Sequence, residues 1–248
     1  MALEKRKRII LFGVPLDCIP EEEFEEAVIE LAKKKGSKRI VFLDLPQFIK
    51  ERRRLKKGKS ILSSADMILT TSLTIQKRAT KFYGAKDVRF YPFAFVIKFL
   101  SVLENHGLSA YFLGGNSKEI MKVFSNIRAS FPNLKVVGRY KGNFSSSESD
   151  NVILGIKKAS PCFLLLGSRI KKATQWVSQS TAYLGDVITF HSPLCFDIMC
   201  GRKKATDENV WIHRSSMRAS TLLPWNWFRW VPYFRFLILS LTDRHRED

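Results

Sequence analysis

A short glycine-rich turn is the first feature of the sequence that could bind a substrate. Gly114 and Gly115 follow the apolar run Ala110–Leu113, and Asn116 precedes a helical pattern that begins at Lys118. Such a turn lets backbone amides and a helix N-terminus approach a phosphate or a sugar. The spacing matches neither the GxGxxG motif nor the Walker A motif, so neither dinucleotide binding nor ATP hydrolysis is indicated. The alternative is a plain tight connection.

Histidine, cysteine and serine residues form no pattern that predicts catalysis or metal binding. His191 follows an apolar run near Asp197, but no second histidine or carboxylate stands at ligand spacing, so we expect a structural or surface role. The cysteines form no CxxC pair, and Cys162 and Cys195 are expected in the core of a protein from a reducing compartment. No GxSxG motif occurs. We therefore expect neither a metal nor another cofactor.

The net charge of +19 over 248 residues is the strongest compositional signal, with 42 Lys and Arg against 23 Asp and Glu. It indicates a polyanionic partner, which could be nucleic acid, an anionic membrane or a phosphate-bearing substrate. The basic run Arg52–Lys59 could contact nucleic acid, although it lacks interleaved aromatic residues. A solvated helix face is the alternative. A basic nucleic-acid-binding protein therefore remains a second hypothesis, although nucleic acid is the less favoured partner.

Alternating strand and helix patterns predict the fold. Continuous apolar runs indicate buried strands at 9–12, 39–43, 66–69, 110–113, 134–137, 162–166 and 186–190. Helical patterns lie between them, at 20–35, 92–104, 118–129 and 149–158. This alternation is typical of right-handed βαβ units. We expect an α/β fold with a Rossmann-like, mostly parallel sheet flanked by helices, and the 45% hydrophobic content excludes a disordered chain.

The composition changes at about Lys203, which predicts a Rossmann-like domain at 1–202 and an appendage at 203–248. The segment 222–241 is apolar, but arginines near its centre argue against a membrane span. Clustered tryptophan with interspersed arginine is typical of a segment in the lipid headgroup layer. We predict contacts with the membrane or lipid phosphates for Trp225, Trp227, Arg229 and Arg235. The alternative is a terminal helix docked on the core.

An ordered series of short motifs runs through nearly the whole chain. It comprises FGVPLD at 12–17, LSSADMIL at 62–69, Arg89, FLGG at 112–115, FPNLKVVG at 131–138, FD at 196–197, GR at 201–202 and WNWFR at 225–229. Each motif alone is unspecific. Their order and spacing resemble the WecG/TagA/CpsF family of bacterial glycosyltransferases, from about Ile9 to Leu241.

The resemblance implies a membrane-peripheral enzyme at the cytoplasmic face of the cell membrane. Family members transfer an N-acetylmannosamine-type hexose from a UDP-sugar to a polyprenyl-diphosphate-linked sugar in cell-envelope polysaccharide synthesis. A carboxylate is the expected general base, without a metal or cofactor. The resemblance assigns substrate binding to Arg89, Gly114, Gly115, Gly138, Asp197, Gly201 and Arg202. Guanidinium groups suit a diphosphate because they pair bidentately with phosphate oxygens.

The chain departs from the family at positions that carry its chemistry. Thr71 stands where the family has its catalytic Asp, and a threonine hydroxyl cannot accept a proton as a carboxylate does. The motif at 167–176 has lost its Pro, Gln and Glu, whose places are taken by Lys171, Ala173 and Thr174. Strand and packing signals persist while the chemical signals are weakened.

Two versions of the glycosyltransferase hypothesis follow from these departures. In the first, the chain is an active enzyme in which Asp66 or Asp87 substitutes as the base. In the second, it is an inactive family member that binds a nucleotide sugar or a lipid diphosphate as a scaffold. A purely structural membrane-interface protein is a further alternative.

Overall fold

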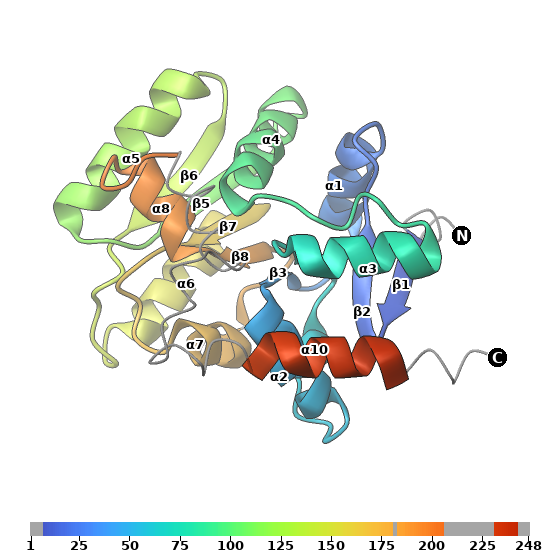
Figure 1. Cartoon of the computed structure of the whole chain (residues 1–248). Coiled ribbons are helices and arrows are strands. Elements are labelled where there is room, and N and C mark those ends of the chain that lie inside the picture. Colours follow the sequence, from blue (N-terminus) through green and yellow to red (C-terminus); the bar gives the residue numbers. More distant parts are fainter. Residues whose placement is uncertain (1–6, 181–182, 206–230, 243–248) are drawn as a thin grey trace. The chain divides into compact units, whose positions relative to one another are not determined.

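The computed structural model describes residues 7–180, 183–205 and 231–242 (Figure 1). The chain forms two compact units. Unit 1 comprises residues 1–21, 41–91 and 209–248, and unit 2 comprises residues 22–40 and 92–208. Most of the predicted appendage at 203–248 falls outside the described residues, so its boundary stays a prediction.

A six-stranded, mostly parallel sheet in the order β4-β3-β8-β7-β5-β6 confirms the predicted α/β fold. Its strands are β3 (Lys38–Leu43), β4 (Met67–Thr70), β5 (Ser109–Leu113), β6 (Lys135–Tyr140), β7 (Phe163–Leu166) and β8 (Ile188–His191). Strand β8 pairs in parallel with β3 and β7, and β5 pairs in parallel with β7 and β6. Every residue of β4 and β7 is buried, which explains their continuous apolar sequences.

The described residues form the helices α1 (Phe24–Lys33), α2 (Leu45–Leu55), α3 (Leu73–Tyr83), α4 (Pro92–Asn105), α5 (Ser117–Ser130), α6 (Ser149–Ala159), α7 (Ala173–Ser180), α8 (Pro193–Met199) and α10 (Val231–Thr242), with a short 3-10 helix, η1 (Ile61–Ser64). The predicted ranges of α1, α4, α5 and α6 are confirmed to within a few residues, whereas α2, α3, α7 and α8 were not predicted. Local capping explains where α2 and α5 begin: Asp44 with Gln47, and Asn116 with Glu119, form capping boxes.

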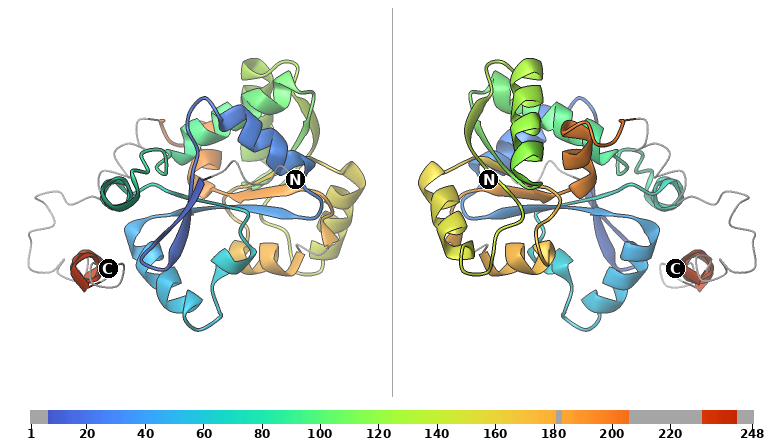
Figure 2. Two further views of the ribbon diagram at one scale, coloured as in Figure 1. Left: turned by 90° about the vertical axis from the view of Figure 1, so that its right-hand side faces the viewer. Right: turned by 90° about the vertical axis from the view of Figure 1, so that its left-hand side faces the viewer.

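Unit 2 has helices on both faces of its strands (Figures 1 and 2). On one face, side chains of α6 and α7 pack against alternate residues of β5 and β7 in one hydrophobic cluster. On the other face, Phe24 of α1 and Phe95 and Phe99 of α4 make ring contacts that extend to Phe163 and Phe190. The covered sheet places the carboxyl ends of β5, β7 and β8 at one edge, where the candidate site lies.

The start of unit 1 differs from the prediction. The first predicted strand, β1 (Lys7–Leu11), pairs antiparallel with β2 (Val14–Cys18), which the sequence did not predict because Gly13 and Pro15 indicate a stop. Phe12 and Gly13 both adopt positive φ, 50° and 75°, as a two-residue hairpin turn requires. The hairpin therefore forms a sheet of its own.

The buried carboxylate of Asp17 ties this hairpin to β4 within unit 1. It accepts hydrogen bonds from Arg8 at 2.7 and 2.9 Å and from the backbone N–H of Ile68 at 2.7 Å. The side chain of Asp17 is almost fully buried, whereas Arg8 is partly exposed. A carboxylate paired with both a guanidinium and a backbone amide can be buried at low cost.

The helix α10 docks on the core of unit 1. Phe236 is buried, and its ring centroid lies 5.4 Å from Phe12 and 5.7 Å from Phe48. The part of the C-terminal segment at 231–242 is therefore a helix docked on the core, which is the alternative that the sequence left open beside a segment in the headgroup layer. Within the described ranges, no helix is both long enough and apolar enough to cross a membrane.

Candidate functional site

Two of the glycines predicted to bind substrate, Gly114 and Gly115, lie with Gly167 in a close-packed glycine cluster at the carboxyl ends of β5 and β7. The backbone N–H of Gly114 donates to Tyr140 at 3.0 Å, that of Gly115 to Ser168 at 2.9 Å, and that of Gly167 to Leu113 at 2.7 Å. A Cβ atom on Gly114 would lie 2.7 Å from the Cα of Gly167. The backbones approach so closely because neither residue carries a side chain.

The ring of Phe196 in α8 covers this glycine cluster. A Cβ atom would come within 2.3 Å of the ring at Gly167 and within 2.7 Å at Gly115, which also has a φ of 64°. Packing alone therefore accounts for these glycines. Substrate binding by Gly114 and Gly115 stays a prediction.

An ionic network joins the beginning of α5 to the segment after α8. Glu119 caps α5 and accepts hydrogen bonds from Arg169 at 2.9 and 3.1 Å and from Arg202 at 2.9 Å. Arg202 also donates to Asp197. The hydrogen bond from Arg169, with a backbone hydrogen bond from Asn116 and the charge of Arg202, lowers the pKa of Glu119 to about 2.

The predicted residues Asp197 and Arg202 are thus in direct contact. They lie near the glycine cluster, because Arg202 also donates a hydrogen bond to the hydroxyl of Ser168 at 3.4 Å. The guanidinium of Arg169 is paired with Glu119. A bound anion would have to displace or share these carboxylate partners. A diphosphate has the charge and geometry to compete for such arginines.

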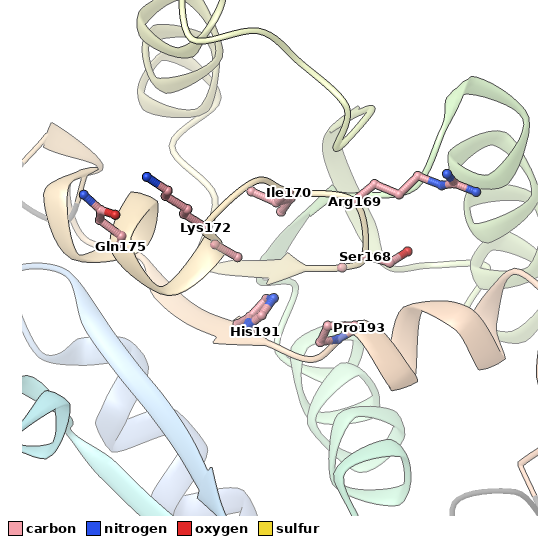
Figure 3. A pocket seen from close by; sticks show the side chains of 9 residues that line it. Ser168, Arg169, Ile170, Lys172, Gln175, His191 and Pro193 are labelled. Atoms are coloured by element: carbon pink, nitrogen blue, oxygen red, sulfur yellow. The ribbon is translucent and has the colours of Figure 1, made fainter. Parts of the chain in front are cut away.

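A cavity of about 430 Å³ opens beside the glycine cluster, at the carboxyl ends of β7 and β8 (Figure 3). It is lined by Gly167, Ser168, Arg169, Ile170, Lys172, Ala173, Gln175, His191 and Pro193. Figure 3 shows His191 and Pro193 on one side of the cavity, and the side chain of Arg169 directed away from Lys172. The lining mixes two cations, two uncharged polar groups and one imidazole.

The imidazole of His191 is half-buried in this cavity. Burial, with the nearby charge of Arg39 on β3, lowers the pKa of His191 to about 4. The ring is therefore neutral at pH 7, with one nitrogen able to accept a proton or a hydrogen bond. In the described part of the chain, no hydrogen bond to this ring is found.

A second group of predicted residues lies in unit 1, at the end of β4. Arg89 donates from Nε to the carbonyl of Thr71 at 3.0 Å and from Nη2 to the hydroxyl of Tyr91 at 2.8 Å. Its guanidinium also stacks 4.7 Å from the centroid of the Tyr91 ring. Thr71 and Arg89 are therefore in contact, but through the backbone carbonyl of Thr71 and not through its hydroxyl group.

Structural contacts occupy the hydroxyls beside Thr71. Thr70 donates from Oγ1 to the carbonyl of Leu43 at 2.7 Å, and the Ser72 side chain caps α3 by accepting from Ile75. Thr71 itself is only 5% exposed. The turn supplies hydroxyl groups and no carboxylate.

Neither of the two carboxylates proposed as substitutes lies at the turn that holds Thr71. Asp66 precedes the four-residue strand β4 and Thr71 follows it, a separation of about 17 Å along an extended chain. Arg89 pairs in parallel with Thr70, so Asp87 lies two residues upstream, roughly 7 Å along the strand direction. The positions of Asp66 and Asp87 do not favour either residue as the base.

Gly138, Gly201 and Arg235 lie outside the cavity lining. Gly138 is in β6, where a Cβ atom would meet the Tyr111 ring at 2.2 Å. Gly201 follows α8 with a φ of 73° and faces Lys122. Arg235 is exposed on α10. Trp225, Trp227 and Arg229 lie outside the described residues.

Sequence reasoning missed Glu119, Arg169, Lys172 and the pocket position of His191. A signal for His191 was present, because a polar residue directly after a buried parallel strand lies at the edge where such sheets bind ligands. The spacing of histidines and carboxylates along the chain predicts only a structural or surface role for it. In residues 7–180, 183–205 and 231–242, no group of three or more His, Cys, Asp or Glu is arranged to hold a metal ion.

Comparisons with known proteins agree with this architecture. The comparison with curated proteins gave no match. A family model described as the glycosyl transferase WecG/TagA/CpsF family matches residues 9–245, which is almost the whole sequence. Members of this family are glycosyltransferases of cell-envelope polysaccharide synthesis. The protein therefore belongs to the WecG/TagA/CpsF family of glycosyltransferases.

Proposed function

We propose that the protein binds a UDP-sugar and transfers its hexose, of the N-acetylmannosamine type, to a polyprenyl-diphosphate-linked sugar. The transfer would take place at the inner face of the cytoplasmic membrane, with the protein peripherally attached. The observation that carries the proposal is the cavity at the carboxyl ends of β7 and β8, in a chain of this family. Open parallel α/β sheets bind their ligands at this edge.

Three changes make up the proposed reaction. The bond between the sugar C1 and the donor phosphate breaks, the acceptor oxygen forms a new bond to C1, and the acceptor hydroxyl loses its proton to a base. The departing diphosphate needs cations, and Arg169, Lys172 and Arg202 lie at or beside the cavity. Lys172 is exposed and lines the cavity, so it is the cation we assign to the donor phosphates.

A second candidate function is binding without transfer. The specific observation that favours it is the Thr71 turn, which lacks a carboxylate and whose neighbouring hydroxyls are used for structure. In this version the protein holds a nucleotide sugar or a lipid diphosphate within an envelope-synthesis complex. The two versions share the binding step and differ in the chemical step.

A calorimetric titration of UDP and UDP-sugars, followed by a transfer assay with a polyprenyl-diphosphate-linked sugar, tests both versions. We expect nucleotide binding that Lys172→Ala weakens about 10-fold, because a charge-assisted hydrogen bond to phosphate is lost. Lys171→Ala is the matched control, because Lys171 is equally exposed but does not line the cavity. Binding with transfer supports the enzyme, and binding without transfer supports the scaffold. Absence of nucleotide binding would refute the enzyme and would leave only a scaffold that binds a lipid diphosphate.

A further inference from the structure

His191 is the last residue of β8 and stands where that strand leaves the sheet. It pairs in parallel register with Leu166, the last residue of β7, whose side chain belongs to the hydrophobic cluster under α6 and α7. The preceding residue, Phe190, contacts Phe95 of α4 on the opposite face. Because successive side chains of a strand alternate between the two faces, the ring of His191 lies on the face that α6 and α7 cover.

Two segments of the chain line the cavity beside this ring (Figure 3). The segment after β7 contributes both cations of the lining, Arg169 and Lys172, whereas the end of β8 contributes His191 and Pro193. Because the ring of His191 is neutral at pH 7, the β8 side of the lining is polar but uncharged. A ligand that has an anionic part and an uncharged polar part matches this division.

The polar side chains next to His191 along the chain are used for structure. Thr189 donates from Oγ1 to the carbonyl of Lys38 at 3.0 Å, and Ser192 caps α8 by accepting from the backbone N–H of Cys195 at 3.3 Å. For the half-buried ring of His191, by contrast, no hydrogen-bond partner is found among the described residues. A polar group left without a partner away from water costs free energy, so a ligand that supplies the partner gains affinity.

The neutral state of the ring decides which ligand group it suits. A neutral imidazole has one N–H donor and one nitrogen acceptor. An ionised phosphate only accepts hydrogen bonds and would leave the acceptor nitrogen unpaired, whereas a hydroxyl or an amide N–H donates to it. Burial and the charge of Arg39 oppose the protonation that would turn the ring of His191 into a phosphate ligand.

We propose that His191 is a specificity residue, which forms a hydrogen bond with an uncharged hydroxyl or amide group of the sugar nucleotide while Lys172 binds its phosphates. Both the hexose and the nucleoside carry such groups, and the experiment distinguishes between them. The inference rests on the proposed binding of a UDP-sugar. It does not depend on transfer, so it holds equally for the enzyme and for a scaffold that binds a nucleotide sugar.

Calorimetric titration of the full chain with UDP-N-acetylmannosamine and with UDP tests the proposal. His191→Leu replaces the ring by an apolar side chain without a donor or acceptor, so we expect about 5- to 10-fold weaker binding of the UDP-sugar. The matched control is His106→Leu, which makes the same change at an exposed histidine of unit 2 outside the cavity. It should change the affinity by less than about twofold.

The two ligands identify which part of the sugar nucleotide His191 contacts. If the group belongs to the hexose, His191→Leu weakens binding of the UDP-sugar and leaves the affinity for UDP within about twofold. If it belongs to the nucleoside, both affinities fall by the same factor. Lys172→Ala should weaken both ligands equally in either case, because both carry the diphosphate.

Two further measurements separate direct contact from a structural role. In protein labelled with ¹⁵N-histidine, the ring resonances of His191 should shift when the UDP-sugar is added, and those of His106 should not. Thermal unfolding of His191→Leu at pH 7 should be no lower than that of the wild type, because the ring makes no hydrogen bond within the described part of the chain. Circular dichroism establishes that each variant is folded.

Three results would overturn the role of His191. The first is unchanged affinity for both ligands in His191→Leu, and the second is the absence of any shift of the His191 ring resonances at saturating UDP-sugar. The third is a lower unfolding temperature of His191→Leu together with equal loss of both ligands, which would assign the ring a structural role.

The outcome also separates this inference from the proposed transfer reaction. Binding that depends on His191 without sugar transfer refutes only the enzyme. Transfer with binding that does not depend on His191 refutes only the role of His191. Absence of nucleotide binding in the wild type refutes both.

Discussion

The turn after β4 in unit 1 and the edge of the sheet in unit 2 both contain motif residues, but they differ in what those residues do. At the β4 turn, Arg89 is occupied by the carbonyl of Thr71 and by Tyr91. At the unit 2 edge, a cavity remains open, and the neutral ring of His191 lines it. The comparison teaches that the unit 2 edge still offers open space and polar groups to a ligand, whereas the polar groups at the β4 turn are used for structural contacts.

Restoring a carboxylate at the β4 turn is the strongest test of this difference. We expect Thr71→Asp to raise the transfer rate by roughly 10²- to 10⁴-fold, the usual contribution of a positioned general base. The affinity for UDP should stay within about twofold, because no change is made in unit 2. Radiolabelled sugar transfer and calorimetry measure the two quantities.

Thr71→Asn is the control for this substitution, because it matches the size of Asp without supplying a base. Transfer that remains at background in Thr71→Asp, with UDP binding intact, would mean that the base is not the only group lost. The altered segment at 167–176 in unit 2 would then carry a further loss.

The docking of α10 on unit 1 gives the next largest effect. Phe236→Ala should lower the free energy of unfolding by about 3–5 kcal/mol, because a buried ring is replaced by a cavity between Phe12 and Phe48. Phe234→Ala removes an exposed ring from the same helix and should cost less than about 1 kcal/mol. Urea unfolding measures both, and equal effects would contradict the docked position of α10.

A side chain added to the glycine cluster of unit 2 should lower the stability of the protein. Gly167→Ala places a Cβ atom 2.3 Å from the Phe196 ring, so we expect about 2–3 kcal/mol of lost stability from overpacking. Gly155→Ala is the control, because no atom lies within 4 Å of its Cβ position and it stands inside α6. That change should stabilise the protein by up to about 1 kcal/mol. A neutral result for Gly167→Ala would argue against the close packing of β5, β7 and α8.

The smallest predicted effect is a pH dependence from His191. Its pKa is about 4 in the folded protein against 6.5 for a free imidazole, so the unfolded chain binds an extra proton between these values. The free energy of unfolding should therefore fall as the pH is lowered from 6.5 toward 4, by up to about 1 kcal/mol per pH unit. Urea unfolding at several pH values measures the slope.

His191→Gln should remove this component of the slope. His106→Gln is the control, because it removes an exposed histidine of the same unit and leaves His191 in place. An unchanged slope in His191→Gln would show that the imidazole is not kept neutral by its surroundings.

Local patterns along the chain were sufficient to predict most elements of the fold. The strands from β3 to β8 and the helices α4, α5 and α6 were predicted because burial imposes periodicity on short stretches of sequence. The absence of a carboxylate at Thr71 is also a property of the sequence alone. The family membership follows from the order of motifs, which a family model over residues 9–245 supports.

The amino-acid sequence by itself determined the α/β class, the family and the presence of a hydroxyl in place of a carboxylate side chain at position 71. Only the tertiary structure decided that the first strand joins an antiparallel hairpin, that Glu119 pairs with Arg169 and Arg202, and that the ring of His191 is neutral in a cavity. The physical reason is distance along the chain. Hydrophobic periodicity acts between near neighbours, whereas charge pairing, desolvation and the placing of α10 against α2 join residues far apart in sequence.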